Sequence, residues 1–198
     1  MAVSSRHGQL LQGAFQARAA EAQIAAKQAR YRALHDEPSR LPNAEYFRVR
    51  LERALRRREP PYQDLAVLYI SLNLEEFQPS IDACGREAIA KSRQSVAAGL
   101  AAASRAEDML GCLGGDTFAC LAPGLSKREH LSALAKKLLS CIPFPLRIGS
   151  LQLCVRPSIG IATYPCGGTG AEALLANAKF AMQRASQREA GHLFADEV

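Results

Sequence analysis

The feature that most constrains the fold is the apolar run LAVLYISLNL at residues 65–74. It is rich in aliphatic and β-branched residues, and turn-forming residues on both sides limit it to the length of a strand. Because residues 65–70 show no alternation of polar and apolar side chains, both faces of such a strand must be covered. The run therefore predicts a buried central strand.

Further elements are predicted on both sides of this strand. The turn residues of GGDT, 114–117, separate two short apolar runs and predict a hairpin over 109–121. A second strand pair is predicted at 150–155 and 158–164, interrupted at Pro157. Apolar periodicity predicts helices over 44–58, 86–104, 127–139 and 171–188. This order predicts an α+β fold, a mostly antiparallel sheet flanked by helices.

The N-terminal part of the chain predicts one long helix, because residues 8–34 contain no proline and no glycine after Gly13. We treat residues 1–34 as a linker or signalling helix and residues 35–198 as the folded domain, since the two prolines of HDEPSRLPN, 35–43, end the helix. Two stripes could form the seam of a homodimer: Phe15, Ala19, Ala22, Ala26, Ala29 and Ala33, or Leu10, Ala17, Ile24 and Tyr31. Alternatively, the helix lies on its own domain.

Composition restricts the class of protein further. No apolar stretch is long enough to span a bilayer and no secretory signal is recognisable, so we expect a cytoplasmic protein or the cytoplasmic part of a larger one. The six cysteines lack metal-site spacing and are expected to be buried free thiols. The net charge of +6 permits an anionic partner. The arginines between 48 and 58 have no interleaved aromatic residues, which favours a solvated face over a nucleic-acid surface.

Several separated motifs resemble the GGDEF family of diguanylate cyclases and together cover about residues 34–194. The central one is GGDTF, residues 114–118, which differs from the family signature at one position. The others are HD with LPN at 35–43, NLEEF at 73–77, SIGIA at 158–162 and AKFAM at 178–182. The resemblance implies a nucleotide-cyclase-like fold, and in active members two domains join two GTP molecules into cyclic di-GMP.

The resemblance also implies that the metal site is lost. Magnesium requires hard oxygen ligands, mainly carboxylates and water. The family's first aspartate at the strand end corresponds to Asn73 and the glutamate of the signature corresponds to Thr117, so that Asp116 is the carboxylate kept from this trio. Glu75 follows in the same strand-exit motif. We therefore expect no magnesium and no other cofactor.

The family's base and phosphate contacts are replaced as well. Its base-contacting asparagine and aspartate correspond to Ile81 and Ala90, which cannot hydrogen-bond to a base edge. Its basic phosphate contacts correspond to Gln78, Cys112 and Ser186. Gly114 and Gly115 either leave space for a nucleotide or only permit the tight turn, and the turn is the preferred interpretation. The resemblance thus predicts a domain without diguanylate cyclase activity.

One family site is retained in the sequence. Arg105 and Asp108 have the RxxD spacing and the distance from the glycines that mark the family's inhibitory product-binding site, and Lys137 corresponds to a further basic contact. An arginine can bind the O6 and N7 acceptors of guanine while a carboxylate accepts from its N–H groups. The alternative is a surface ion pair of small energetic value.

Two functions of different classes follow. The first is a receptor or regulatory module that binds cyclic di-GMP through Arg105, Asp108 and Lys137. The second is a structural dimerisation or protein-interaction module that binds no nucleotide, in a larger signalling protein that carries a phosphodiesterase or another signalling domain. Nucleic acid is not an expected partner, and an active cyclase is the least favoured class.

Overall fold

The computed structural model describes residues 18, 20–57 and 64–197. The chain divides between His35 and Asp36 into two compact units, each described here by itself. In the first unit, residues 20–34 are helical and residues 20–33 are all exposed. The predicted helix from residue 8 therefore lies partly outside the described residues. No helix in the described part of the chain is long and apolar enough to cross a membrane.

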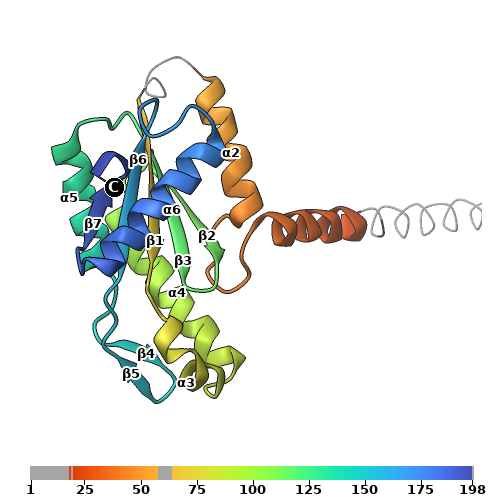
Figure 1. The fold of residues 1–198 in the computed structure, drawn as a ribbon. Coiled ribbons are helices and arrows are strands. Elements are labelled where there is room, and N and C mark those ends of the chain that lie inside the picture. Colours follow the sequence, from red (N-terminus) through yellow and green to blue (C-terminus); the bar gives the residue numbers. More distant parts are fainter. Residues whose placement is uncertain (1–17, 19, 58–63, 198) are drawn as a thin grey trace, which may run out of the picture. The chain divides into compact units, whose positions relative to one another are not determined.

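The second unit is an α+β domain, as predicted (Figure 1). Its helices are α2 (Ala44–Arg56), α3 (Gln78–Asp82), α4 (Arg86–Ala103), α5 (Arg128–Ser140) and α6 (Ala171–Gln187), with short 3-10 turns at Glu75–Phe77 and Ala195–Glu197. Its strands are β1 (Leu65–Ser71), β2 (Met109–Gly114), β3 (Thr117–Pro123), β4 (Leu146–Ile148), β5 (Leu151–Leu153), β6 (Ser158–Thr163) and β7 (His192–Phe194).

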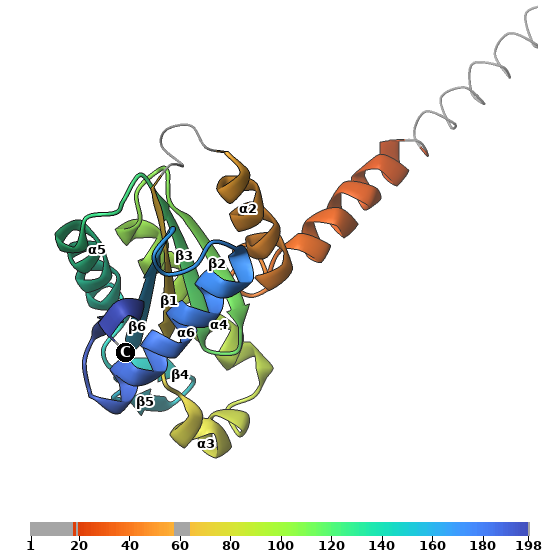
Figure 2. The same ribbon diagram turned by 45° about the horizontal axis from the view of Figure 1, so that its top comes forward.

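The main sheet has the strand order β2-β3-β1-β6-β7, with β1 in the centre. All its pairings are antiparallel except that of β6 with β7. Helices α2 and α6 cover one face and α4 and α5 the other (Figures 1 and 2). Along β1, Leu68 and Ile70 pack with the α4 and α5 side while Leu65 and Val67 pack with the α2 and α6 side. The predicted central strand is confirmed, although it ends at Ser71 rather than at residue 74.

The predicted second strand pair is wrong. β5 pairs with β4 in a separate two-stranded sheet, and β6 instead joins the main sheet between β1 and β7. Gly149, with φ of 62°, makes the tight turn between β4 and β5. Pro157 lies between β5 and β6 and has no N–H to donate to a neighbouring strand. The strand pairing is therefore interrupted between the two-stranded sheet and the main sheet.

The cysteine prediction is also partly wrong. All six thiols are free, and Cys112 and Cys120 are buried as expected. Cys154 and Cys166 are exposed, because they lie in the loops that flank β6 rather than in the core.

Side-chain hydrogen bonds fix the segment that leads into α2. Both the amide N and the hydroxyl of Ser39 donate to Asp36 Oδ2, at 3.0 and 2.6 Å. Asn43 caps α2 by accepting from the amide of Tyr46 at 2.9 Å. The amide of Cys112 donates to the Pro42 carbonyl at 2.8 Å, which anchors this segment to the edge strand β2.

Candidate functional site

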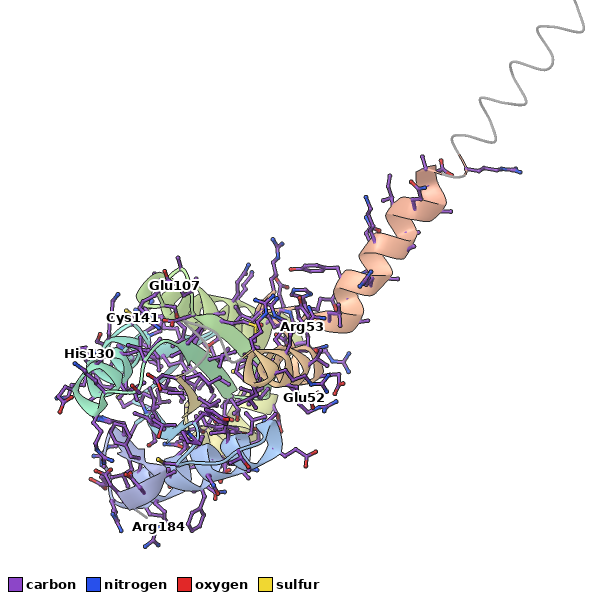
Figure 3. All side chains as sticks on the ribbon, turned by 90° about the horizontal axis from the view of Figure 1, so that it is seen from above. Glu52, Arg53, Glu107, His130, Cys141 and Arg184 are labelled. Carbon is purple, nitrogen blue, oxygen red and sulfur yellow. The ribbon has the colours of Figure 1, made fainter. Side chains whose placement is uncertain are left out.

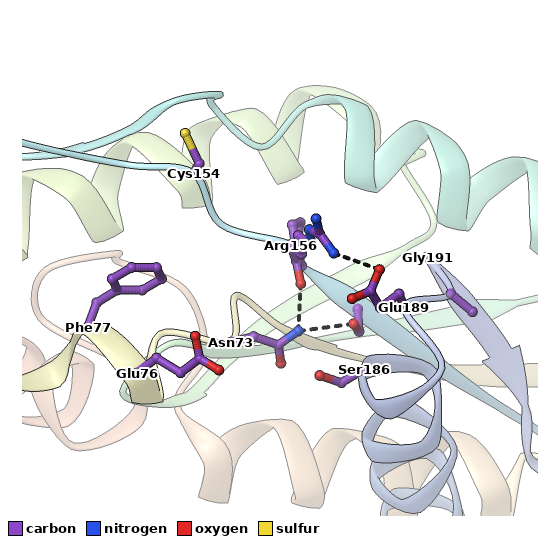
Figure 4. Close-up of a pocket in the computed structure, with 11 residues that line it drawn as sticks. Asn73, Glu76, Phe77, Cys154, Arg156, Ser186, Glu189 and Gly191 are labelled. Atoms are coloured by element: carbon purple, nitrogen blue, oxygen red, sulfur yellow. Dashed lines mark hydrogen bonds and ion pairs between the residues drawn. The ribbon is translucent and has the colours of Figure 1, made fainter.

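Four segments that are distant in the sequence meet where β1 ends: the β1 exit, the β2–β3 turn, the loop before β6 and the C-terminal half of α6. Asn73, Asp116 and Thr117 line a pocket of about 590 Å³ there, together with Lys179 and Ser186 of α6. A neighbouring pocket of about 490 Å³ shares Asn73 and Ser186 and extends to Arg156 and Glu189 (Figure 4). Of the residues predicted for the vestigial catalytic site, the structure thus brings together Asn73, Glu75, Asp116 and Thr117.

Asn73 acts as a structural link between β1 and β6. Its Nδ2 donates to the carbonyl O of Arg156 at 2.6 Å and to the Ser158 hydroxyl at 3.0 Å (Figure 4). Its backbone is in the left-handed region, with φ of 55°, which asparagine tolerates better than most residues. A carboxylate has no proton to donate to a carbonyl oxygen, so the amide is suited to this contact as the family's aspartate would not be.

Asp116 is also held by the protein itself. One carboxylate oxygen accepts from the amide of Leu74 at 3.0 Å and from the Ser71 hydroxyl at 3.4 Å. The Thr117 hydroxyl lies 3.3 Å from the other oxygen. Asp116 therefore joins the β2–β3 turn to the β1 exit. Burial, and to a smaller extent the charge of Asp116, raises the pKa of Tyr69 above its ordinary value.

These residues do not fit a magnesium site. Asn73 and Thr117 are both neutral, and the Asp116 carboxylate already accepts hydrogen bonds from the Leu74 amide and from hydroxyls. Glu75 lines the pocket but is exposed. Within the described ranges, no group of three His, Cys, Asp or Glu side chains is arranged so that it could hold a metal ion.

The residues at the predicted base positions lie on the other side of the β1 exit. Ile81 of α3 is 4% exposed and lines a mainly apolar pocket of about 140 Å³. Ala90 does not line it, whereas its neighbour Ile89 and Arg93, one turn further along α4, do. Sequence reasoning missed both. A helical projection of α4 could have found Arg93, because it lies one turn after Ile89 on the same face.

The three replaced phosphate contacts are separated in the structure. Gln78 donates to Asp82 at 2.7 Å, within the short helix α3. Cys112 is buried in β2, and burial raises the pKa of its thiol. Ser186 lines both pockets beside Asn73. Lys179 places a cation near Thr117, and sequence reasoning had treated it as part of a helix motif only.

Arg105 and Asp108 form a closed turn between α4 and β2. Asp108 Oδ2 accepts from the Arg105 amide at 2.8 Å, and Asp108 Oδ1 accepts from Arg105 Nη2 at 2.6 Å. Nη2 also donates to the Pro123 carbonyl at 3.1 Å. The Asp108 side chain is 0% exposed and that of Arg105 is 36% exposed. The hydrogen bond to Asp108 is the largest cause of the raised pKa of Arg105.

Beside this turn is a small basic pocket of about 190 Å³, which we call the arginine pocket. It is lined by Arg50, Arg53 and Arg57 of the α2 region, by Glu107 of the turn, and by Ala54, Met109, Leu121 and Pro123. Figure 3 labels Arg53 on α2 and Glu107 before β2. Sequence reasoning had assigned these arginines to a solvated face only. Lys137 is exposed on α5 and does not line the arginine pocket.

Comparison with known proteins decides the family. The family model described as "Diguanylate cyclase, GGDEF domain" matches residues 33–192, which is most of the chain. The chain belongs to the GGDEF family.

Curated relatives and solved structures agree with this assignment. The chain is 35% identical over 158 residues to the bifunctional diguanylate cyclase/cyclic di-GMP phosphodiesterase MucR and 31% identical over 162 residues to the diguanylate cyclase TpbB, both from Pseudomonas aeruginosa. These alignments cover 79% and 81% of this chain but 22% and 37% of the relatives. The GGDEF domain thus corresponds to a minor part of both relatives.

Among solved structures, a truncated TpbB comprising only the GGDEF domain superimposes with a TM-score of 0.70 and 32% identity, over 81% of this chain and 94% of that one. The coiled coil and GGDEF domain of DgcB from Caulobacter crescentus, in complex with c-di-GMP, gives a TM-score of 0.71 over 89% of this chain and 93% of that one. Its identity is 18%, so this second likeness shows the shared fold alone.

Proposed function

We propose that this GGDEF domain is catalytically inactive and acts as a regulatory module that binds cyclic di-GMP. The observation that carries the first half is the Asn73 amide, which donates to the Arg156 carbonyl and the Ser158 hydroxyl where a cyclase needs a metal-binding carboxylate. An amide brings no negative charge, so Asn73 is a much weaker magnesium ligand than the carboxylate that it replaces.

The contacts that GTP binding needs to the base and to the phosphates are also replaced, each at its own positions. At the base positions, Ile81 and Ala90 offer no hydrogen bond, and each unpaired polar group of a bound base would cost about 1–3 kcal/mol. At the phosphate positions, Gln78 is bonded to Asp82, Cys112 is buried and Ser186 is neutral. Because several such costs accumulate, we propose that the domain neither binds Mg·GTP productively nor forms cyclic di-GMP.

The arginine pocket supports the proposed binding of cyclic di-GMP. It places Arg50, Arg53 and Arg57 beside the Arg105–Asp108 turn. Groups that can bind phosphate and groups that can bind guanine would therefore lie in one corner of the domain. Cyclic di-GMP combines two guanines with two phosphates, and arginine suits both because its donors form a planar fork. DgcB, a protein with the same fold, has been crystallised in complex with this ligand.

Binding at this corner requires a rearrangement. The Asp108 carboxylate is fully buried and already accepts hydrogen bonds from the amide, the Nε and the Nη2 of Arg105. Guanine could contact both side chains only after the guanidinium turns away from Asp108 and from the Pro123 carbonyl. The energy of the broken pair would be subtracted from the binding energy, so the proposal implies a weaker affinity than a preformed site would give.

Calorimetric titration of the full chain with cyclic di-GMP tests the receptor function. We expect saturable binding that Arg105→Ala and Arg53→Ala each weaken at least about tenfold. Lys137→Ala tests the further basic contact. Arg48→Ala is the matched control, because Arg48 lies on the same helix but pairs with Glu45 at 2.8 Å and does not line the arginine pocket. Absence of binding by the parent chain would refute the receptor function.

The absence of catalysis needs a separate assay. The full chain is incubated with Mg·GTP and the products are separated by chromatography. We expect no cyclic di-GMP, and detection of this product would overturn the interpretation of Asn73 and Thr117. TpbB, as an active relative by its name, provides the positive control.

The buried state of Asp108 favours one second candidate, an interaction module that binds no nucleotide. In that case the Arg105–Asp108 pair only stabilises the turn, and the domain acts through protein partners. Relatives such as MucR combine cyclase and phosphodiesterase functions by name, so a phosphodiesterase domain in the same full-length protein is the partner we propose for it.

A further inference from the structure

A small pocket separate from the arginine pocket lies between α3, the N-terminal half of α4 and the ends of β1 and β3. Its volume is about 140 Å³. Most of its lining is apolar and comes from five segments: Leu72, Leu74, Ile81, Ile89, Phe118 and Ile148. We call it the isoleucine pocket.

The polar side chains that line the isoleucine pocket are Glu75, Gln78, Ser92, Arg93 and Asp116. Arg93 lines it but is already paired through Nη1 with Asp36 at 3.3 Å. Asp116 also lines it and, within the described residues, is in no ion pair. Its carboxylate accepts from the Leu74 amide and the Ser71 hydroxyl, and a carboxylate has further lone pairs. Because the cation is neutralised and Asp116 and Glu75 are both acidic, the pocket disfavours an anion.

Guanine does not suit this pocket. Its O6 and N7 acceptors would find few free donors there, because Ile81 has none, Gln78 already donates to Asp82 and Arg93 is paired with Asp36. An apolar ring has no such groups to leave unsatisfied, and the branched aliphatic walls would bury it. The volume also fits, since a dry cavity on the order of 150 Å³ lined by Leu, Ile and Phe accommodates benzene in another protein.

We propose that the isoleucine pocket binds a small neutral aromatic molecule that carries one hydrogen-bond donor, of the size of phenol or indole. The ring lies among Ile81, Ile89 and Phe118, and its O–H or N–H donates to the Asp116 carboxylate. The Arg93 guanidinium adds a cation–π contact to the ring face. This site is independent of cyclic di-GMP binding and does not depend on the proposed function.

Methyl NMR of the full chain with labelled isoleucines tests the site directly. Titration with indole should give saturable shifts of the Ile81, Ile89 and Ile148 methyl signals and leave Ile24, on the helix before residue 35, unchanged. Benzoate, an anionic ring, and guanosine should bind at least about tenfold more weakly. Equal or tighter binding of guanosine at these methyl groups would overturn the assignment of ligand class.

Substitutions then locate the ligand. Ile89→Trp, at a half-buried position, should fill the pocket and abolish the indole-induced shifts of Ile81 and Ile148. Val49→Trp on α2 is the matched control, because Val49 is 37% exposed and does not line this pocket. Ile81→Asn is a second test and should weaken indole at least about tenfold. Thermal unfolding confirms that each variant is folded. Unchanged indole binding by folded Ile89→Trp would place the ligand elsewhere and refute the proposal.

Discussion

At the residue scale, Asn73 combines a left-handed backbone conformation with a side chain that donates hydrogen bonds. Its φ of 55° lies in the left-handed region, and its amide is the donor that bridges β1 to the loop before β6. Asparagine and aspartate both tolerate this backbone conformation, so the backbone alone does not distinguish them. The hydrogen bonds do, because they require a donor.

We therefore predict that Asn73→Asp destabilises the domain. The new carboxylate would lie 2.6 Å from the Arg156 carbonyl, an acceptor facing an acceptor, and should lower the free energy of unfolding by about 1–3 kcal/mol. Because this contact favours the protonated carboxyl, the loss should be largest above the ordinary aspartate pKa and smaller at acidic pH. Urea titrations at two pH values measure both effects.

Asn177→Asp is the control for this prediction. Asn177 makes the same kind of amide-to-carbonyl bond, to Gly167 at 2.9 Å, but it is exposed on α6. Solvent can hydrate a carboxylate there, so a smaller loss is expected. If the two variants lose equal stability, Asn73 has no special role in joining β1 to β6.

The thiols provide a prediction about reactivity. Cys154 and Cys166 are exposed, whereas Cys120 is fully buried and burial raises the pKa of its thiol well above the ordinary value. A raised pKa means less thiolate at a given pH, so Cys120 and Cys112 should react slowly. Maleimide labelling of the native chain, read by mass spectrometry, should modify Cys154 and Cys166 first. Early labelling of Cys120 would contradict the buried position.

Single residues show how far the sequence could predict the site. Alignment with a known pattern located Asn73, Asp116 and Thr117, and these three do line one pocket. It could not reveal that Asn73 bonds to Arg156, because that contact joins segments 83 positions apart. The arginine pocket was missed for a similar reason: α2 supplies the charges and the start of β2 supplies the opposite wall.

At the element scale, the packing of α6 on β6 depends on Gly160. A Cβ at this position would lie 1.9 Å from the Ala178 carbonyl O and 2.2 Å from the Met182 N, both backbone atoms of α6. Neither atom can move without displacing the helix. We predict that Gly160→Ala lowers the free energy of unfolding by about 3 kcal/mol or more, at the upper end of overpacking effects.

Gly170→Ala provides the comparison, because nothing lies within 4 Å of a Cβ placed at Gly170. Its φ of −129° is accessible to any residue, so little change is expected. Denaturant titrations of both variants measure the difference. Similar stability of the two would mean that α6 can move away from β6 at little cost.

A second element, the C-terminal segment, is held to α5 by Arg128. Its guanidinium pairs with Asp196 and Glu197 and lies 4.0 Å from the centre of the Phe194 ring. Exposed ion pairs and cation–π contacts each contribute about 0–1 kcal/mol. Arg128→Ala should therefore speed amide exchange at β7 with only a small loss of global stability. Unchanged exchange at β7 would show that the pairing with β6 alone holds the strand.

The sequence predicted the central strand but did not determine how the strands of residues 150–164 pair. The run over 65–74 defined the central strand because a fully apolar segment has only one place in a sheet covered on both faces. Residues 150–164 have no such constraint, since both short runs fit either a hairpin or two separate sheets. The missed signal was the Gly149–Ser150 turn between two matching triplets, Leu146–Ile148 and Leu151–Leu153.

At the scale of the whole molecule, residues at the family's catalytic positions help to hold the GGDEF fold together. Asn73 joins β1 to the β6 entry, Asp116 joins the signature turn to the β1 exit, and Ile81 belongs to the core. Each of these three side chains is thus held by contacts within the domain.

The last prediction concerns association through the N-terminal helix. Leu10, Ala17, Ile24 and Tyr31 recur every seven residues, and Ile24 and Tyr31 are 55% and 49% exposed. Burial of apolar area contributes about 25 cal/mol per Å², so this stripe gains more from a dimer seam than the alanine stripe. We predict a concentration-dependent dimer that Ile24→Glu shifts to monomer in sedimentation velocity experiments.

Gln28→Glu, which adds the same charge to an exposed position of the same helix outside both stripes, should leave the dimer intact. If Ala26→Glu dissociates the dimer and Ile24→Glu does not, the alanine stripe is the seam. A chain that remains monomeric at every concentration would show that the helix does not mediate association by itself. Because a seam with only three large apolar residues per helix, Leu10, Ile24 and Tyr31, is weak, the dimer should dissociate on dilution, as mass action requires.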